Sequence, residues 1–173
     1  TRPEIAKYLE TTYTVIGEAI QCDYTDPLYL DCRNPCNDVN FRKAIFSIVN
    51  KGWICESVYL GMAERIDVPI AAPSAEWMNT SLTGDNYPYP YDPDAAEAYL
   101  NAGGWNDTDD ADTTINYPEG WPGRPGRPNI DPLIYYIYND PPQRYTYAHQ
   151  IAENLRALGI LVEEHVAPFT VIN

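Results

Sequence analysis

The hydrophobic positions after residue 37 follow the period of an amphipathic helix. Five apolar residues recur at intervals of three and four, which places them on one helical face: Phe41, Ala44, Ile45, Ile48 and Val49. Asn37 or Asp38 can cap the first turn, so the pattern predicts a helix that runs to about Lys51. A second short helix is expected from Trp53 to Leu60, because Gly61 then offers an end signal.

Two further helices are predicted by their end signals as well as by their apolar spacing. Asp92 can cap a helix whose first turn contains Pro93, and Gly103 then offers a left-handed stop. Residues 140–143 read Asp-Pro-Pro-Gln, which has the form of a capping box with proline in the first turn. The helix that follows is expected to end at Gly159.

The remaining apolar runs are short, and the segments between them contain many prolines and glycines. Residues 11–21, 28–32 and 130–138 are predicted as strands, and residues 160–162 lead into another. Residues 62–91 and 104–130 are predicted as loops. Strands that alternate with helices make an α/β or α+β layered domain with a mixed sheet flanked by helices. The length of 173 residues predicts a single domain that spans residues 1–173.

Charge and composition narrow the function classes. The chain has 11 Lys plus Arg against 25 Asp plus Glu, a formal net charge of −14. A field of that sign repels phosphate backbones, so nucleic-acid binding is not expected. The 15 tyrosines and 4 tryptophans suit interfaces and ligand clefts, because each offers an apolar face and a polar tip. They equally suit a wet surface that is rich in loops.

Four cysteines lie in the first third of the chain: Cys22, Cys32, Cys36 and Cys55. An even number in an acidic chain fits an extracellular protein with disulfides, and their spacing lacks the paired CxxC of a zinc site. Four cysteines allow three connectivities. The predicted helices favour a Cys36–Cys55 bond, which leaves Cys22 and Cys32 to bridge neighbouring strands.

Residue patterns for catalysis and for metal binding are absent from the sequence. Only two residues, His149 and His165, could serve as bases near neutral pH. Both are predicted to be ordinary half-exposed side chains. The acidic run from Asp107 to Asp112 departs from a calcium-binding EF-hand loop, since Ala111 and Asp112 stand at key positions. A carboxylate pair for hydrolysis could exist among 25 acids, but nothing marks two of them. We therefore expect a protein that is not an enzyme and that needs no metal or cofactor.

Five segments, in order and at compatible spacing, resemble motifs of one family. Residues 34–45 (NPCNDVNFRKAI) resemble its N-P-P-F-x-D-x-R-x-R-x-A segment, and residues 61–70 resemble its G-x-A-x-P-x-x-x-P-I-P loop. Residues 91–105 resemble Y-D-P-x-x-A-x-x-L-L-x-x-A-G-W, and the acidic loop 106–112 stands where many members have x-D-x-D-G-D-G. Residues 151–162 resemble I-x-x-x-L-x-x-x-G-I-x-V. On these motifs, nearly the whole chain resembles the family 5 extracellular solute-binding proteins.

The resemblance implies a fold and a function. The fold would be one lobe of a type II periplasmic-binding-protein-like structure, here part of the second (C-terminal) lobe. The N-terminal lobe and the C-terminal return of the family are not represented in these 173 residues. The function would be extracellular capture of a solute, with peptides favoured, for an ABC importer. The implied partners are the solute, a membrane permease and the missing N-terminal lobe, at the extracellular face of the membrane or in the periplasm.

Four residues are predicted to face the cleft between such lobes: Tyr29 and Asp31 at a strand end, and Pro69 and Trp77 in the loop 69–77. Tyr29 and Trp77 could instead only pad the loop against the sheet. Two other function classes stay open. One is a stand-alone extracellular carbohydrate- or surface-binding module, suggested by Tyr87-Pro88-Tyr89-Pro90-Tyr91 and by the acidic exterior. The other is an extracellular hydrolase.

Two tripeptides have the form of N-glycosylation sequons. They are Asn79-Thr80-Ser81 and Asn106-Asp107-Thr108. Short sequons arise often by chance, so at this level they are only consistent with a surface location.

Overall fold

The computed structural model describes residues 35–68, 76–108, 112–122 and 124–168. These residues belong to two compact units, and each is described by itself. Among the described residues, the smaller unit contains 66–88, and the larger contains 35–65 together with 89–168. The strands expected at residues 11–21 and 28–32 lie outside the described residues. A single domain over 1–173 stays a prediction.

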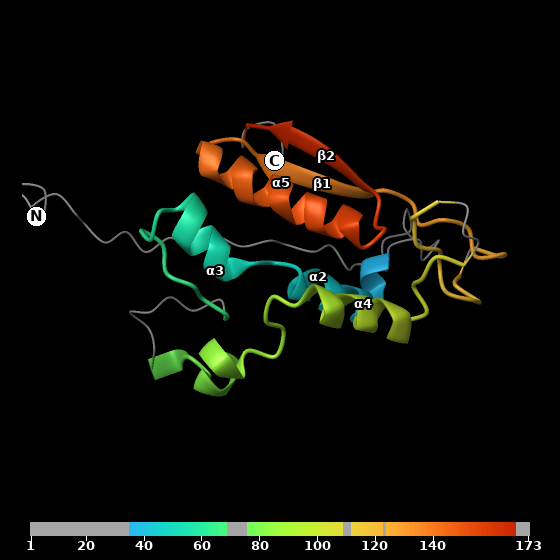
Figure 1. The fold of residues 1–173 in the computed structure, drawn as a ribbon, viewed down its shortest axis with the longest axis horizontal. Helices are drawn as coiled ribbons and strands as arrows, with labels where there is room; N and C mark the ends of the chain where they lie inside the picture. The colour runs from blue at the N-terminus through green and yellow to red at the C-terminus, as the bar shows by residue number, and fades with distance from the viewer. Residues whose placement is uncertain (1–34, 69–75, 109–111, 123, 169–173) are drawn as a thin grey trace, which may run out of the picture. The chain divides into compact units, whose positions relative to one another are not determined.

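The larger unit contains helices and a parallel strand pair. In chain order its elements are η2 (Pro35–Asn37), α2 (Val39–Ser47), α3 (Lys51–Trp53), the π-helix η3 (Ile54–Val58), α4 (Pro93–Ala102), β1 (Leu133–Tyr138), α5 (Pro142–Ala157) and β2 (Val162–Ala167). Figure 1 shows α5 lying along the β1–β2 pair and α2 lying beside α4. The smaller unit contains two 3-10 turns, η5 (Thr80–Leu82) and η6 (Gly84–Asn86). The α/β fold class expected from the sequence is confirmed.

β1 and β2 are joined by α5, and they pair in parallel from Leu133↔Val162 to Tyr138↔Ala167. β1 begins three residues later than predicted. Its side chains alternate in exposure, with Ile137 buried and Tyr136 58% exposed, because α5 covers only one face of the pair. A single βαβ unit therefore accounts for the described sheet.

The helix at residues 39–47 is shorter than predicted. Asp38 caps it as expected, and its Oδ1 accepts a hydrogen bond from the Phe41 amide at 2.8 Å. The helix ends at Ser47 instead of Lys51, because Asn50 starts a new turn: its Oδ1 accepts from the Trp53 amide at 2.9 Å. The next helical segment then runs from Lys51 to Val58, first as α3 and then as η3.

α4 begins and ends as predicted, with one correction at its C-terminal end. Asp92 caps it by accepting from the Ala95 amide at 3.0 Å. The left-handed residue is Gly104, with φ +79°, whereas Gly103 remains right-handed with φ −83°. Gly103 is needed for space instead, since a Cβ there would lie 2.7 Å from Cδ1 of Trp105.

α5 lacks the predicted capping box. The residue before the helix is Pro141, and no side chain caps the first turn. Asp140 therefore lies one position too early to serve as the cap. Pro142 occupies the first helical position, where a backbone N–H would have no partner within the helix, so its lack of an N–H costs no hydrogen bond. The other end is as predicted, because Gly159 has φ +77°.

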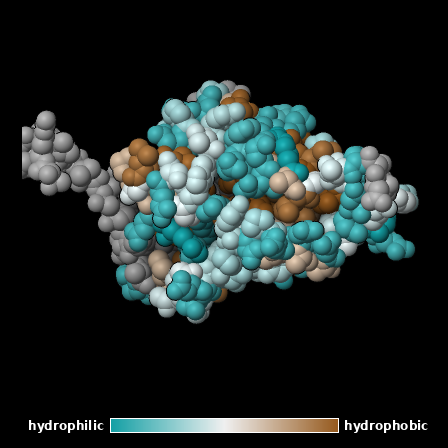
Figure 2. Space-filling view, in the orientation of Figure 1, coloured by the Kyte–Doolittle hydropathy of each residue, from teal (hydrophilic) through white to brown (hydrophobic). Residues whose placement is uncertain are grey.

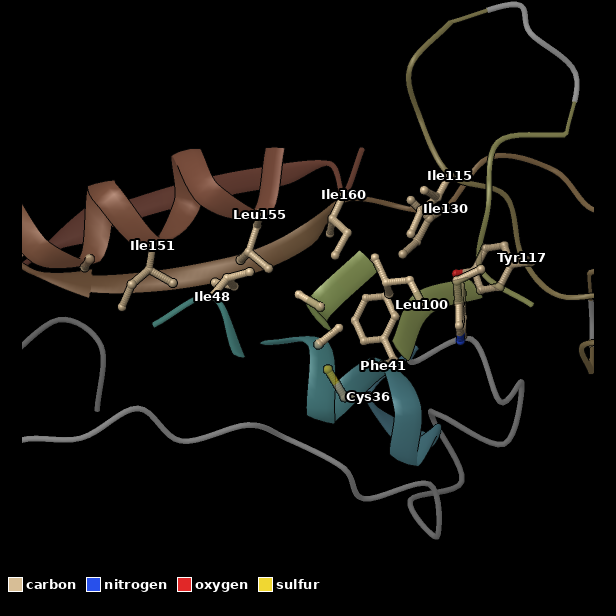
Figure 3. Close-up of a cluster of buried hydrophobic side chains, with 14 of the residues drawn as sticks. Cys36, Phe41, Ile48, Leu100, Ile115, Tyr117, Ile130, Ile151, Leu155 and Ile160 are labelled. Atoms are coloured by element: carbon tan, nitrogen blue, oxygen red, sulfur yellow. The ribbon is translucent and has the colours of Figure 1, made fainter. Parts of the chain in front are cut away.

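A buried indole organises the core of the larger unit. Trp105 is fully buried, and its ring centroid lies 4.8 Å from that of Phe41 and 5.5 Å from that of Tyr117. Apolar side chains from α2, α4 and α5 and from the loop segments near residues 115 and 130 form one buried cluster with it, and Figure 3 shows Phe41, Leu100 and Ile160 in this cluster. Asn154 on α5 also donates to the carbonyl oxygen of Ile48 at 3.0 Å, which ties α5 to the end of α2.

The predicted Cys36–Cys55 disulfide is wrong. The structure does not join the two sulfur atoms. Cys36 precedes α2 and is buried in the core, whereas Cys55 lies in η3, beyond the other end of that helix. Cys55 is only partly buried there, and both cysteines remain thiols. Cys22 and Cys32 lie outside the described residues, so their pairing stays a prediction.

Two phenylalanines on α2 provide a matched test of this core. Phe41 is fully buried, and Phe46 on the same helix is 41% exposed. Phe41→Ala should lower the free energy of unfolding by about 3–5 kcal/mol, because it leaves a cavity beside Trp105. Phe46→Ala should lower it far less. Urea unfolding followed by circular dichroism measures both, and equal losses would contradict this account of the core.

Candidate functional site

Two tyrosines, Tyr59 and Tyr138, lie near Arg144 at one end of the βαβ unit and form a cluster with it. Arg144 lies in the first turn of α5, Tyr138 ends β1, and Tyr59 follows η3. The guanidinium carbon of Arg144 lies 6.0 Å from the centre of the Tyr138 ring. Figure 1 shows the start of α5 close to the segment labelled α3, which continues into η3. In open α/β sheets ligands bind outside the carboxyl ends of the strands, which is where this cluster lies.

Two polar atoms of the cluster are enclosed and have no hydrogen-bond partner among the described residues. They are the hydroxyl oxygen of Tyr59 and Nε of Arg144. Burial raises the pKa of the Tyr59 phenol, and the positive charge of Arg144 opposes that rise. The phenol is therefore a neutral donor at physiological pH. An enclosed polar group without a partner costs free energy unless water or a ligand pairs with it.

Arg144 differs from Arg124 and Arg156 in its surroundings. Arg124 pairs with Asp131, and Arg156 pairs with Glu153 and Glu164. Arg144 has no carboxylate partner among the described residues, although acids outnumber bases 25 to 11 in the sequence. It also lies at the positive end of the α5 dipole, and no side chain caps that end.

The cluster can therefore receive an anion. A guanidinium offers a fork of N–H donors that matches the two oxygens of a carboxylate, and the Tyr59 hydroxyl adds a third donor. The uncapped start of α5 contributes a favourable dipole. A neutral ligand would leave the charge of Arg144 unmatched, so the chemistry of the cluster favours a carboxylate.

The sequence-predicted site residues and the Arg144 cluster are different sets. Tyr29, Asp31 and Pro69 lie outside the described residues, and their role stays a prediction. Trp77 belongs to the smaller unit and is 77% exposed, so its ring is available for contact. Sequence reasoning missed Tyr59 and Arg144. The only signal for Arg144 was its place in the first turn of a helix, where a positive charge is unfavourable.

One group of side chains among the described residues has metal-ligand composition. Ligand atoms of His149, Glu153 and Glu164 lie within 4.8 Å of one another. Arg156 already supplies the positive charge there, with Nη1 2.6 Å from Glu153 and Nη2 2.7 Å from Glu164. His149 Nδ1 lies 3.0 Å from Oε2 of Glu164. The group is therefore an ion-pair network that joins α5 to β2.

The acidic loop uses a carboxylate to hold its own backbone. Oδ1 of Asp112 accepts from the Thr114 amide at 2.6 Å, and its Oδ2 accepts from Nδ2 of Asn129 at 3.0 Å. The Thr114 hydrogen bond is the main reason that the pKa of Asp112 falls below its usual value. Asn129 in turn accepts from the fully buried Asn116 at 2.8 Å. Asp112 therefore serves as a structural anchor of this loop.

The tyrosine- and proline-rich run 87–91 is partly used for packing. The Tyr89 ring stacks on Phe46 at 6.1 Å and meets the edge of Tyr99 at 6.2 Å. Tyr89 is half-buried by these contacts, whereas Tyr91 is 43% exposed. Tyr89 therefore packs against α2 and α4, so the run does not present a continuous aromatic surface.

The surface around these groups is mainly hydrophilic. Figure 2 shows hydrophobic residues gathered near the C-terminal end of α5, while most of the rest of that face is hydrophilic. Among the helices that the structure describes, none combines the length and the apolarity that a membrane crossing requires.

Comparison with known families gives a match over nearly the whole chain. Residues 3–172 match the family model described as "Bacterial extracellular solute-binding proteins, family 5 Middle". No curated protein matches the sequence.

Solved structures give the same fold at low sequence identity. An oligopeptide-binding protein from Thermus thermophilus, complexed with a pentapeptide, has a TM-score of 0.65 and 23% identity over 85% of this chain and 22% of that chain. A periplasmic oligopeptide-binding protein from Thermotoga maritima, bound to mannohexaose, has a TM-score of 0.61 and 22% identity over 79% and 24%. NikZ from Campylobacter jejuni, in complex with Ni(L-His), has a TM-score of 0.57 and 20% identity over 80% and 25%. The chain therefore spans about a quarter of the length of these proteins.

The ion-pair network makes a prediction about pH. Burial acts to raise the pKa of Glu164, but hydrogen bonds from His149 and Arg156 outweigh it and hold that pKa below its usual value. Its stabilisation is therefore present at neutral pH and is lost as the pH falls through the lowered pKa. Glu164→Gln should cost about 1.5 kcal/mol of unfolding free energy at neutral pH and should flatten the loss of stability on acidification.

Glu163 on the same strand is the matched control, because its side chain is 59% exposed in its pair with His165. Glu163→Gln should change the unfolding free energy by no more than about 0.5 kcal/mol. Thermal unfolding across the acidic range measures both variants. Identical pH profiles for the two would contradict the role given to Glu164.

Proposed function

The chain belongs to family 5 of the bacterial extracellular solute-binding proteins, and we propose that it forms one wall of the solute site in the binding protein of an ABC importer. The observation that carries the proposal is the family match over residues 3–172. This family and the similar structures are binding proteins rather than enzymes. The residue patterns agree, because the sequence offered no catalytic constellation.

The proposed solute is a peptide with a free carboxylate. The similar structures bind a pentapeptide, mannohexaose and Ni(L-His), so the fold alone does not choose a ligand. The residues of this chain favour one class: Arg144 lacks a carboxylate partner among the described residues, and the Tyr59 hydroxyl lacks a hydrogen-bond partner there. A peptide carboxylate would pair with both, whereas a neutral sugar would leave the guanidinium charge unmatched.

The proposal gives this chain only part of the site. Since it spans about a quarter of the similar structures, a second lobe of the same protein would supply the opposite wall. The lobes would then close on the solute by a hinge motion, and the closed form would dock on the membrane permease of the importer. This takes place at the extracellular face of the membrane or in the periplasm.

The alternative of a stand-alone carbohydrate- or surface-binding module is not favoured. It rested on the aromatic run 87–91 and on the acidic exterior, which a solute-binding protein shares equally well. Tyr89 at the centre of that run packs between Phe46 and Tyr99, which leaves only part of the run for a sugar. The family match also runs from residue 3 to residue 172.

Calorimetry tests the proposal and the role of Arg144 together. The natural protein that contains this chain should bind a pentapeptide with a free C-terminus more tightly than the same peptide with a C-terminal amide. Arg144→Gln should weaken the first by about tenfold to a hundredfold, since a hydrogen bond to a charged group contributes about 1.5–3 kcal/mol. It should leave binding of the amide unchanged.

Lys43→Gln is the matched control for charge. Lys43 is on α2, away from the Arg144 cluster, and its Nζ lies 5.5 Å from the centre of the Tyr99 ring of α4. Its loss changes the net charge by the same amount. It should not alter either affinity. Equal binding of the two peptides by the natural protein would refute the carboxylate site, and tighter binding of an oligosaccharide than of any peptide would refute the peptide proposal.

A further inference from the structure

The two sequons differ in their local geometry. In the smaller unit, Asn79, Thr80 and Ser81 are all exposed at the surface. The Asn79 Oδ1 accepts from the Ser81 amide at 3.1 Å and from the Ser81 hydroxyl at 2.7 Å. Both bonds end on the amide oxygen of Asn79, and no described residue pairs with its amide nitrogen Nδ2. The tripeptide thus leaves Nδ2 of Asn79 available, while the Ser81 hydroxyl is held against the Asn79 side chain by its hydrogen bond to Oδ1.

The second sequon is committed to the fold of its loop. Asn106 lies in an antiparallel bridge with Asn116, whose amide donates to the Asn106 carbonyl at 3.1 Å. The Asn106 Oδ1 accepts from Arg127 at 2.9 Å. The Thr108 hydroxyl donates to the Asn116 side chain at 2.8 Å and not to Asn106. Because Asn116 is fully buried, this arrangement cannot change without opening the loop.

A third observation concerns Trp77, two residues before Asn79. It is 77% exposed, so the faces of its indole ring are open to contact from a group attached nearby. The C–H face of a pyranose ring is apolar and packs on the face of an aromatic ring. A sugar on Asn79 would begin close to this indole in the sequence, so Trp77 offers a surface for it.

From these three observations we propose that Asn79, and not Asn106, is the acceptor of an N-linked glycan whose first sugar packs on Trp77. The co-substrate is a lipid-linked oligosaccharide, supplied with its transferase outside the cytoplasm. Nδ2 of Asn79 attacks C1 of the first sugar, so a new N–C1 bond forms while the bond from C1 to the lipid phosphate oxygen breaks. The lipid phosphate leaves with the bonding electron pair, and the proton of Nδ2 passes to a base of the transferase. Nothing is oxidised or reduced.

Site mapping on the folded chain tests the acceptor. The natural protein that contains this chain is incubated in its folded form with an oligosaccharyltransferase that accepts any N-x-S/T sequon and with its lipid-linked donor. Modified peptides are then identified by mass spectrometry. Synthetic peptides covering residues 74–84 and 101–113 are treated in parallel. We expect both peptides to accept the glycan, and the folded chain to accept it at Asn79 alone. Modification of the folded chain at Asn106, or none at Asn79, would overturn the proposal.

Variants separate the sequon from its surroundings. Asn79→Gln and Ser81→Ala should each lose the added mass, while Ser81→Thr should keep it because the hydroxyl remains. Thr80→Ala is the matched control, since it alters the same turn and leaves the sequon intact. Retention of the glycan by Ser81→Ala would contradict the part given to the Ser81 hydroxyl.

The contact with Trp77 has its own readout. In the glycosylated chain, the indole protons of Trp77 should show nuclear Overhauser effects to ring protons of the first sugar. Trp77→Ala should still be glycosylated, because the sequon does not include residue 77. Absence of the Overhauser effects in a chain that carries the glycan on Asn79 would overturn the packing part of the proposal.

Discussion

One carboxylate, Asp38, holds together the part of the fold on which the rest of the larger unit depends. Its Oδ1 caps α2 through the Phe41 amide and also accepts from Nε1 of Trp105 at 3.3 Å. The same oxygen thus fixes the start of a helix and the plane of the fully buried indole. Phe41 and Trp121 then pack against that indole with ring centroids 4.8 Å away. Gly103 completes the arrangement, because any side chain there would collide with Trp105.

The site inherits its geometry from this core through α5. Ile151 and Leu155 of α5 are buried, and Asn154 bonds to the end of α2, so the helix cannot slide along the sheet. Its first turn therefore holds Arg144 at a fixed place near Tyr138 and Tyr59. The ion pair of Arg156 with Glu164 and the contact of His149 Nδ1 with the same carboxylate fasten this helix to β2. The proposed anion site thus lies on a helix that is held at several points along its length.

The sequence predicts best where the determining contacts are local. The start of α4 is fixed by Asp92 and Pro93, which act within one turn, and it was predicted to the residue. The end of α2 was missed, because Asn50 can either continue a helix or cap the next one, and apolar spacing does not distinguish the two. The Cys36–Cys55 prediction was wrong for a related reason, since placing two cysteines on neighbouring helices does not bring their sulfur atoms within bonding distance.

The candidate site could not be predicted from the sequence, for a different physical reason. Tyr59 and Arg144 are 85 residues apart in the sequence (144 − 59), and they meet only because η3 packs against α5. No motif spacing encodes such a meeting. The family resemblance gave the fold class and the kind of function, because five segments kept their order. It could not indicate that Arg144 would lie beside Tyr138 with its Nε enclosed and without a hydrogen-bond partner.

The continuity of the βαβ unit has a consequence for the order of folding. β1, α5 and β2 occupy the single stretch 133–167, so their contacts close short loops, whereas α2 and α4 must meet across more than 40 intervening residues. Loop closure costs more conformational entropy as the loop lengthens, and contacts close in sequence form faster. We therefore expect the C-terminal third of the chain to collapse first and to serve as the template onto which α2 and α4 dock. In a chain synthesised from its N-terminus, this core then forms only after residue 167 has emerged, and Phe41 and Trp105 stay exposed to solvent until then.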